Sequence, residues 1–212
     1  MSTDVTRDFA FGLPKAELHL HLEGTLEPDL KLALARKNGV DIGQSTVEEV
    51  RSTYQFNDLT SFLAVYYPAM DVLQDEDDFH DLAAAYFERA RANGVVRAEC
   101  FFDPQAHTSR GIAIETVIRG YYRAVVEARE SGLSADLILC FLRDMSAESA
   151  LETLQVALPY KDMFIGVGLD SDERDNPPTK FADVFALARE AGLHVTMHCD
   201  IDQIGSIDNI RA

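Results

Sequence analysis

The chain reads Glu17-Leu18-His19-Leu20-His21-Leu22-Glu23-Gly24 close to its start. Polar and apolar residues alternate strictly, so a strand would carry its acidic residues and histidines on one face and its leucines on the other. Two imidazoles side by side on a short strand indicate a divalent metal ion, because neutral imidazole is its commonest nitrogen ligand. The alternative is an amphipathic edge strand with a solvated face, and the purely apolar opposite face favours the metal site.

Composition indicates a globular protein with an acidic surface. The 212 residues are 47% hydrophobic and 26% charged, enough to bury a sizeable core in one large domain or two small ones. The 19 basic and 36 acidic residues give a net charge of −17, which repels phosphate backbones. Residues 1–8 are polar and do not resemble a signal peptide, and the chain has no apolar run of membrane-spanning length. These features predict neither nucleic acid nor a membrane as a partner.

The cysteines point to a reducing compartment. Cys100, Cys140 and Cys199 are odd in number, and each lies in or beside an apolar segment that is typical of a buried strand. We therefore expect reduced thiols in a cytoplasmic protein rather than a disulfide framework.

Strands and helices are predicted to alternate along the chain. The expected strands are 16–22, 95–102, 135–142, 164–170 and 193–198. The main expected helices are 28–38, 75–92, 112–131 and 180–191, and 103–105 is expected to be a loop. This alternation predicts a parallel sheet covered by helices. The turn after the first strand lacks the G-x-G-x-x-G of dinucleotide-binding folds, whereas polar groups at the carboxyl ends of strands are typical of barrel enzymes.

The fifth predicted strand supplies a third candidate ligand. His194, Thr196 and His198 share one of its faces, and His198 stands at the carboxyl end, level with His19 and His21 if the strands are in register. Three histidines with open positions are typical of a catalytic metal. A hydrogen-bonded core histidine is the alternative for His198, and the neighbouring pair favours the ligand.

The other histidines are assigned more modest roles. His194 begins the strand and is interpreted as structural, His80 is expected on a helix surface, and His107 in a loop or beside the site. The fourth strand ends at Asp170 on the rim, and its glycines, Gly166 and Gly168, leave room for a ligand or a close backbone approach.

Several segments together resemble the adenosine/adenine deaminase family of metal-dependent amidohydrolases. Residues 13–28 (LPKAELHLHLEGTLEP) are similar to the opening of that family, and the similarity continues in 103–111 (DPQAHTSRG), 168–173 (GLDSDE) and 177–181 (PPTKF). The segment 101–105 (FFDPQ) and the turn after the fourth strand resemble the adenine deaminase branch more than the adenosine branch.

The resemblance implies a TIM-type (β/α)8 barrel with one zinc ion per subunit. It assigns the metal to His19, His21 and His198. It places three acidic residues near the substrate, namely Glu23, Asp170 and Glu173. The implied reaction is hydrolytic deamination of adenine to hypoxanthine, in which water attacks C6 and ammonia leaves, with a small-molecule purine as the partner. The formation of a homo-oligomer is left open.

Two departures from the family pattern qualify this interpretation. The family has His-Ala-Gly-Glu at the fifth strand, where the glutamate protonates the ring, and here Ile201 takes its place. Asp200 or Asp202 is expected to replace it, with Asp200 slightly preferred because it would share a face with His198. The alternatives are a deaminase of adenosine or another 6-aminopurine, or a catalytically impaired purine-binding relative.

The second departure is length. A complete barrel takes roughly 250 residues or more. Residues 1–212 are therefore interpreted as a single catalytic barrel domain truncated at its C-terminus, which holds about the first five strand–helix units. A further metal ligand is expected beyond Ala212, and an isolated 1–212 chain is expected to aggregate and to be inactive.

Overall fold

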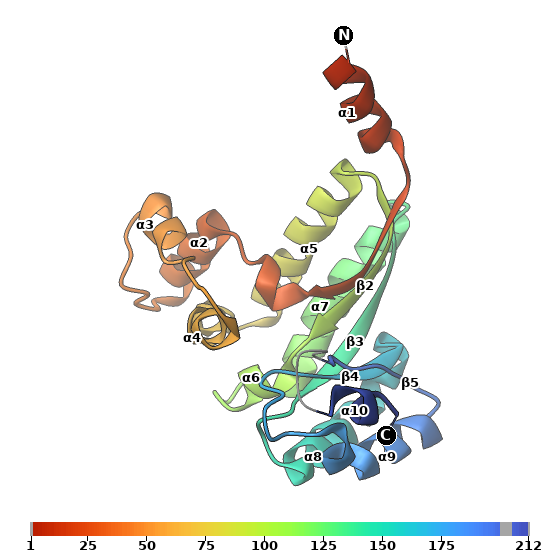
Figure 1. Cartoon of the computed structure of the whole chain (residues 1–212). Helices are drawn as coiled ribbons and strands as arrows, with labels where there is room; N and C mark the ends of the chain where they lie inside the picture. Colours follow the sequence, from red (N-terminus) through yellow and green to blue (C-terminus); the bar gives the residue numbers. More distant parts are fainter. Residues whose placement is uncertain (1, 200–204, 212) are drawn as a thin grey trace.

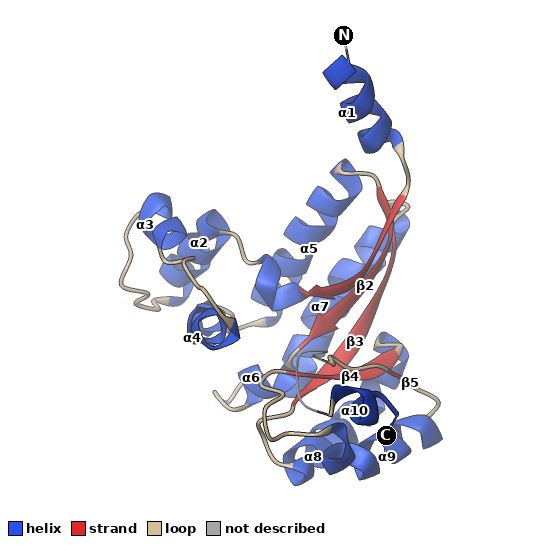
Figure 2. Cartoon of the chain, in the orientation of Figure 1, coloured by secondary structure: helices blue, strands red, loops and turns tan. Residues whose placement is uncertain are grey.

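The computed structural model describes residues 2–199 and 205–211. It contains one sheet of five parallel strands in the order β1-β2-β3-β4-β5 (Figure 2). The strands are β1 (Lys15–His21), β2 (Val95–Phe102), β3 (Ser134–Leu142), β4 (Gly166–Asp170) and β5 (His194–Val195). Each strand pairs with the next along the chain, which is the order in a barrel. The predicted parallel sheet is confirmed.

Helices connect the strands and cover one face of the sheet. Figure 1 shows α5 and α7 side by side along this face, with α2, α3 and α4 grouped apart from the sheet and α1 projecting away from it. The bounds are α1 (Ser2–Gly12), α2 (Pro28–Asn38), α3 (Val47–Ser52), α4 (Leu59–Ala69), α5 (Glu76–Ala92), α6 (Pro104–Thr108), α7 (Ile114–Glu130), α8 (Ala147–Ala157), α9 (Ala182–Glu190) and α10 (Ser206–Arg211).

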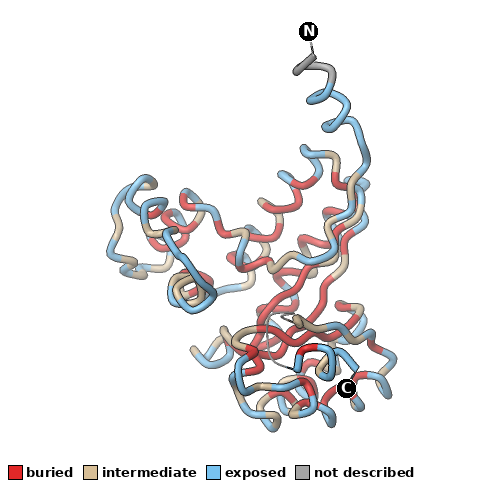
Figure 3. Tube along the Cα trace, viewed as in Figure 1, coloured by how far each residue is buried: buried red, intermediate tan, exposed pale blue. Residues whose placement is uncertain are grey.

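The main core lies between the sheet and these helices, and Figure 3 shows the burial concentrated there. Ala98, Cys100 and Phe102 alternate along β2 and belong to this core. The opposite face of the sheet, here called the inner face, carries a small separate cluster around Phe101 and Ile138. The inner face is therefore free to carry polar groups at the carboxyl ends of the strands.

A bulge in β1 breaks the predicted alternation. Glu17 pairs with Ala98 and Leu20 with Cys100, so three steps along β1 match two along β2. The bulge turns Glu17 toward the helices, where Tyr86 donates a hydrogen bond to its carboxylate at 2.8 Å. The prediction that Glu17 shares the face of the histidines, with Leu18 on the apolar face, is therefore wrong, and Leu18 is 54% exposed.

Both histidines nevertheless remain on the inner face. His21 pairs with Phe101 across the strands, and the ring of His19 stands edge-on to the Phe101 ring with centroids 4.7 Å apart. The extra residue falls between Glu17 and Leu20. It therefore changes the face of the side chains at the start of the strand, while those at its carboxyl end still face inward.

The two glycines of β4 allow close approaches within the protein. A Cβ atom at Gly168 would lie 2.6 Å from Cys140 Sγ, and one at Gly166 would lie 2.8 Å from the carbonyl oxygen of His194. The predicted close approach is therefore confirmed. β5 is shorter than predicted, but the His198 N–H still donates to the Leu169 carbonyl at 2.9 Å, which continues the pairing as far as the candidate ligand.

The segment after β2 is a short helix rather than the predicted loop. Pro104 occupies the first turn of α6, where its missing N–H needs no partner. This helix buries His107 completely.

Cys100, Cys140 and Cys199 form no disulfide bond with one another. Within residues 2–199 and 205–211, no helix combines the length and the apolar character needed to cross a membrane.

Candidate active site

Three histidines converge at the carboxyl end of the sheet. The Nε2 atom of His198 lies 3.0 Å from Nε2 of His19 and 2.9 Å from Nε2 of His21. His19 and His21 come from the last part of β1, and His198 follows β5 at the same level. The structure thus brings together the three ligands predicted from the sequence.

The geometry and charge of this cluster fit a divalent cation. Neighbouring nitrogen ligands of a tetrahedral zinc ion stand about 3.3 Å apart, given Zn–N bonds of about 2.0–2.1 Å. Burial, followed by the charges of His21 and His19, lowers the pKa of His198 to about 4. Burial and His21 also lower the pKa of His19. Two of the three imidazoles are therefore neutral at physiological pH, as metal ligation requires.

Two buried carboxylates face the far side of the His21 ring. Its Nδ1 atom lies 3.3 Å from Asp170 Oδ2 and 3.9 Å from Asp103 Oδ1, while Nε2 points to the cluster. Histidines that bind metals usually donate their second ring N–H to such a group, which orients the ring. Burial alone would lower the pKa of His21, but the two carboxylates outweigh it and raise this pKa to about 10.

Asp103 was not predicted to be a site residue, although its position in the sequence indicates that role. It directly follows β2, just as Asp170 ends β4, and polar residues at these positions build the sites of barrel enzymes. Asp170, predicted to contact the substrate, lines the cavity described below but directs Oδ2 to His21.

Zinc binding should release about one proton from His21 at neutral pH. The raised pKa keeps the ring protonated below about pH 10, and a zinc ion must displace the proton on Nε2. Zinc affinity should therefore rise with pH between 6 and 8, and calorimetry in buffers of different ionisation enthalpy would count the protons. Replacing Asp170 by asparagine should reduce the proton release. An affinity independent of pH over this range would contradict the assignment.

A cavity of about 670 Å³ opens beside the histidines. One wall is α4, whose Tyr66 donates to Asp103 Oδ2 at 3.3 Å and whose Tyr67 donates to Ser171 Oγ at 2.9 Å. These two bonds link α4 to the residues that directly follow β2 and β4. Its lining includes the three histidines of the cluster and the aromatic side chains of Phe62, Tyr66 and Tyr67.

A buried arginine, which was also not predicted from the sequence, holds the backbone on the far side of the site. Arg143 directly follows β3 and is 0% exposed. Its Nη1 donates to the carbonyl of His198 at 3.0 Å, and its Nε donates to the carbonyl of Asn176 at 2.9 Å. Glu173, predicted to contact the substrate, lines the cavity and lies 3.7 Å from this guanidinium. A charged residue right after an apolar strand was the available signal.

Glu23 is placed differently from the prediction. β1 ends at His21, and the 3-10 turn Leu22–Thr25 swings this carboxylate into the protein, where Glu23 is 2% exposed. It is absent from the residues that line the cavity. This placement argues against direct contact with a substrate.

The remaining candidates lie outside the cluster or outside the described residues. The predicted proton donors, Asp200 and Asp202, lie outside the described residues. His194 is exposed at the start of β5 and is not part of the histidine cluster. His80 is partly buried between Asp81 and Glu127 on the helical side.

Known proteins share this arrangement of elements. An adenine deaminase from Geotalea uraniireducens (strain Rf4) is 57% identical over 187 residues, covering 88% of this chain and 53% of the relative. The crystal structure of adenine deaminase from Arthrobacter aurescens matches with a TM-score of 0.89 and 49% identity over 93% of this chain and 60% of that one. An amidohydrolase from Burkholderia ambifaria with bound zinc matches with a TM-score of 0.82 and 30% identity, covering 93% and 55%.

The chain thus spans 53–60% of the length of its relatives named here, and its sheet is part of a TIM barrel of the amidohydrolase type. The family model described as adenosine deaminase matches residues 14–202. That match includes all three histidines of the cluster. The chain therefore belongs to the adenosine deaminase family.

Proposed function

We propose that the protein is a zinc-dependent aminohydrolase that converts adenine and water to hypoxanthine and ammonia. The observation that carries this proposal is the position of His198 Nε2, which lies 3.0 Å from His19 Nε2 and 2.9 Å from His21 Nε2 on the wall of a cavity with an aromatic side. The adenine deaminase relatives support the choice of substrate.

The described residues suggest a division of labour. His19, His21 and His198 would hold one zinc ion per subunit, which when bound supplies a water activated for attack near neutral pH. Asp103 and Asp170 would hold the His21 ring in its orientation. The rings of Phe62 and Tyr66 offer flat apolar surfaces for a purine. Asp200 remains our preferred donor of a proton to a ring nitrogen, and Asp202 is the alternative.

The charge of the cavity favours an uncharged purine over a nucleotide. Its lining includes five carboxylates, those of Asp58, Asp103, Asp170, Asp172 and Glu173. Among the described lining residues, Arg174 is the single arginine or lysine, and its Nη2 is already 2.6 Å from Asp172 Oδ2. A phosphate group would therefore meet net repulsion.

Adenosine or another 6-aminopurine remains the second candidate substrate, because the cavity is large enough to hold it. A volume of about 670 Å³ lies within the ordinary range for small-molecule sites and leaves room beyond a free base. A ribose carries no charge, so the acidic lining does not oppose a nucleoside.

Ammonia release from the zinc-loaded, full-length protein tests the proposal. The panel is adenine, adenosine, a modified 6-aminopurine and AMP. We expect adenine to give the highest kcat/KM, and AMP to be at least about a hundredfold worse, or about 2.7 kcal/mol in transition-state free energy. Faster turnover of AMP would overturn the charge argument. No ammonia from any of the four, with zinc bound, would instead favour a purine-binding relative without activity.

A further inference from the structure

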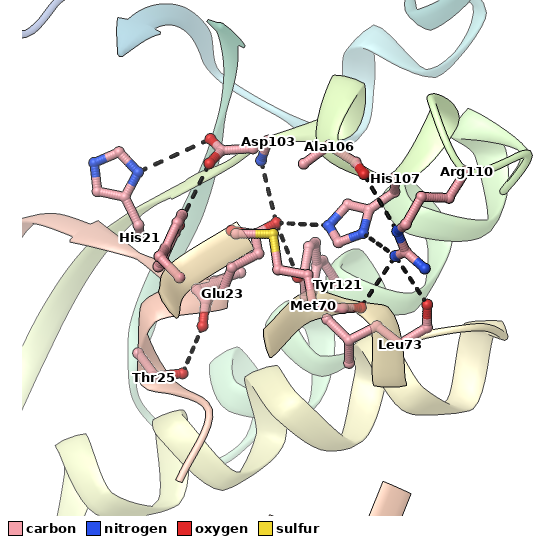
Figure 4. A network of polar contacts seen from close by, with 12 residues as sticks. His21, Glu23, Thr25, Met70, Leu73, Asp103, Ala106, His107, Arg110 and Tyr121 are labelled. Atoms are coloured by element: carbon pink, nitrogen blue, oxygen red, sulfur yellow. Dashed lines mark hydrogen bonds and ion pairs between the residues drawn. The ribbon is translucent and has the colours of Figure 1, made fainter. Parts of the chain in front are cut away.

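A buried carboxylate beside the metal cluster joins three separate elements through one oxygen atom. Glu23 Oε1 accepts hydrogen bonds from the Asp103 backbone N–H at 3.1 Å, from Tyr121 Oη at 3.0 Å and from His107 Nε2 at 3.2 Å (Figure 4). The donors lie at the end of β2, on α7 and on α6, and the side chains of all four residues are almost completely buried. This oxygen is therefore a junction of the fold.

The direction of these hydrogen bonds is fixed by an arginine. Arg110 Nη2 lies 2.9 Å from His107 Nδ1 and also donates to the carbonyls of Met70 and Leu73. A guanidinium can only donate, so His107 Nδ1 must accept and its proton resides on Nε2. The Nε2–H group is then the donor to Glu23. A cation thus stands at one end of the chain of bonds and an anion at the other, and this compensates the burial of the carboxylate.

The junction is connected directly to the candidate metal ligand. Glu23 follows His21 by two residues, and its carboxylate accepts a hydrogen bond from the backbone N–H of Asp103. The carboxylate of Asp103 in turn lies 3.9 Å from His21 Nδ1. Figure 4 shows the three residues in this succession. The Glu23 side chain therefore links the turn that follows His21 to the backbone of Asp103.

We propose that Glu23 is a positioning residue for the metal site, which acts on His21 through Asp103 and does not touch the substrate. The inference rests on the zinc site of the proposed function. Because the effect is geometric, aspartate at this position would be one methylene too short to reach all three donors. Glutamine keeps both the length and an acceptor oxygen, so it should preserve most of the arrangement.

Zinc affinity of the full-length protein, measured by competition with a chelator, tests this. Glu23→Asp should raise the Kd for zinc about tenfold, the lower end of what changes around metal ligands cost. Glu23→Gln should stay within about threefold of the parent protein. Glu17→Asp is the matched control, because Glu17 lies on β1 near the histidines and, like Glu23, accepts from a tyrosine, but faces the helices. It should leave the Kd unchanged.

Several results would overturn the proposal. One is an unchanged zinc Kd in Glu23→Asp, and another is an equal loss in Glu17→Asp, which would indicate general destabilisation. A raised KM for adenine with an unchanged zinc Kd would indicate substrate contact instead. If Glu23→Asp does not fold, Tyr121→Phe removes one donor and should still weaken zinc binding about twofold to threefold, and parental affinity there would overturn the proposal. Zinc binding without ammonia release in the parent protein would contradict the proposed function alone.

Discussion

Replacing His21 by alanine should lower the affinity for zinc by roughly 100- to 1,000-fold. The free energy of zinc binding in proteins, about 10–16 kcal/mol, is shared among a few ligands, so each ligand contributes a large part of it. Nε2 of His21 is 2.9 Å from that of His198, so its loss removes one corner of the cluster. It also leaves the buried carboxylates of Asp103 and Asp170 without the imidazole between them. Metal content after dialysis, and the Kd from chelator competition, would measure the effect.

His194→Ala is the matched control for this loss. His194 lies on β5, four residues before His198, and is exposed outside the histidine cluster. Its removal should leave zinc affinity within about twofold, as for a surface change away from special features. Similar losses in the two variants would refute the ligand assignment. Thermal melts of the two metal-free variants would separate loss of ligation from loss of fold.

The histidine cluster could be predicted because its signal is local. The spacing of His19 and His21 places both on one face of the end of a strand, whatever happens earlier in that strand. The bulge before Leu20 could not be predicted, because it depends on how β2 pairs with β1 and not on the hydrophobic pattern of β1. The predicted face of Glu17 was consequently wrong, whereas the predicted face of the two histidines was correct.

The surroundings of the cluster depend on contacts between residues far apart in the chain. Glu23 looks polar and close to the site in the sequence, but its partners Tyr121 and His107 come from elements 98 and 84 residues away. Arg143 similarly reaches His198 across 55 residues. Such partners decide whether a carboxylate faces a substrate or the interior, and no periodicity in the sequence reports them.

Arg143→Met should lower the free energy of unfolding by about 3–5 kcal/mol, the usual cost of removing one partner of a buried ion pair. Arg143 is 0% exposed, and its loss leaves the Glu173 carboxylate without its guanidinium 3.7 Å away. The carbonyl oxygens of His198 and Asn176 lose their donors as well. Urea titration of the parent and variant proteins would measure the change.

The double variant Arg143→Met/Glu173→Gln distinguishes the buried charge from the lost volume. Because glutamine removes the negative charge that faces Arg143, the double variant should be more stable than the sum of the two single changes predicts. Arg174→Met is the exposed control: Arg174 is also paired with an acidic residue, but its side chain is 60% exposed, so the urea midpoint should not move. Since Arg143 also holds the backbone of His198, the variant should bind zinc more weakly than Arg174→Met. Strict additivity in the double variant, together with unchanged zinc affinity, would mean that Arg143 only fills space beneath the site.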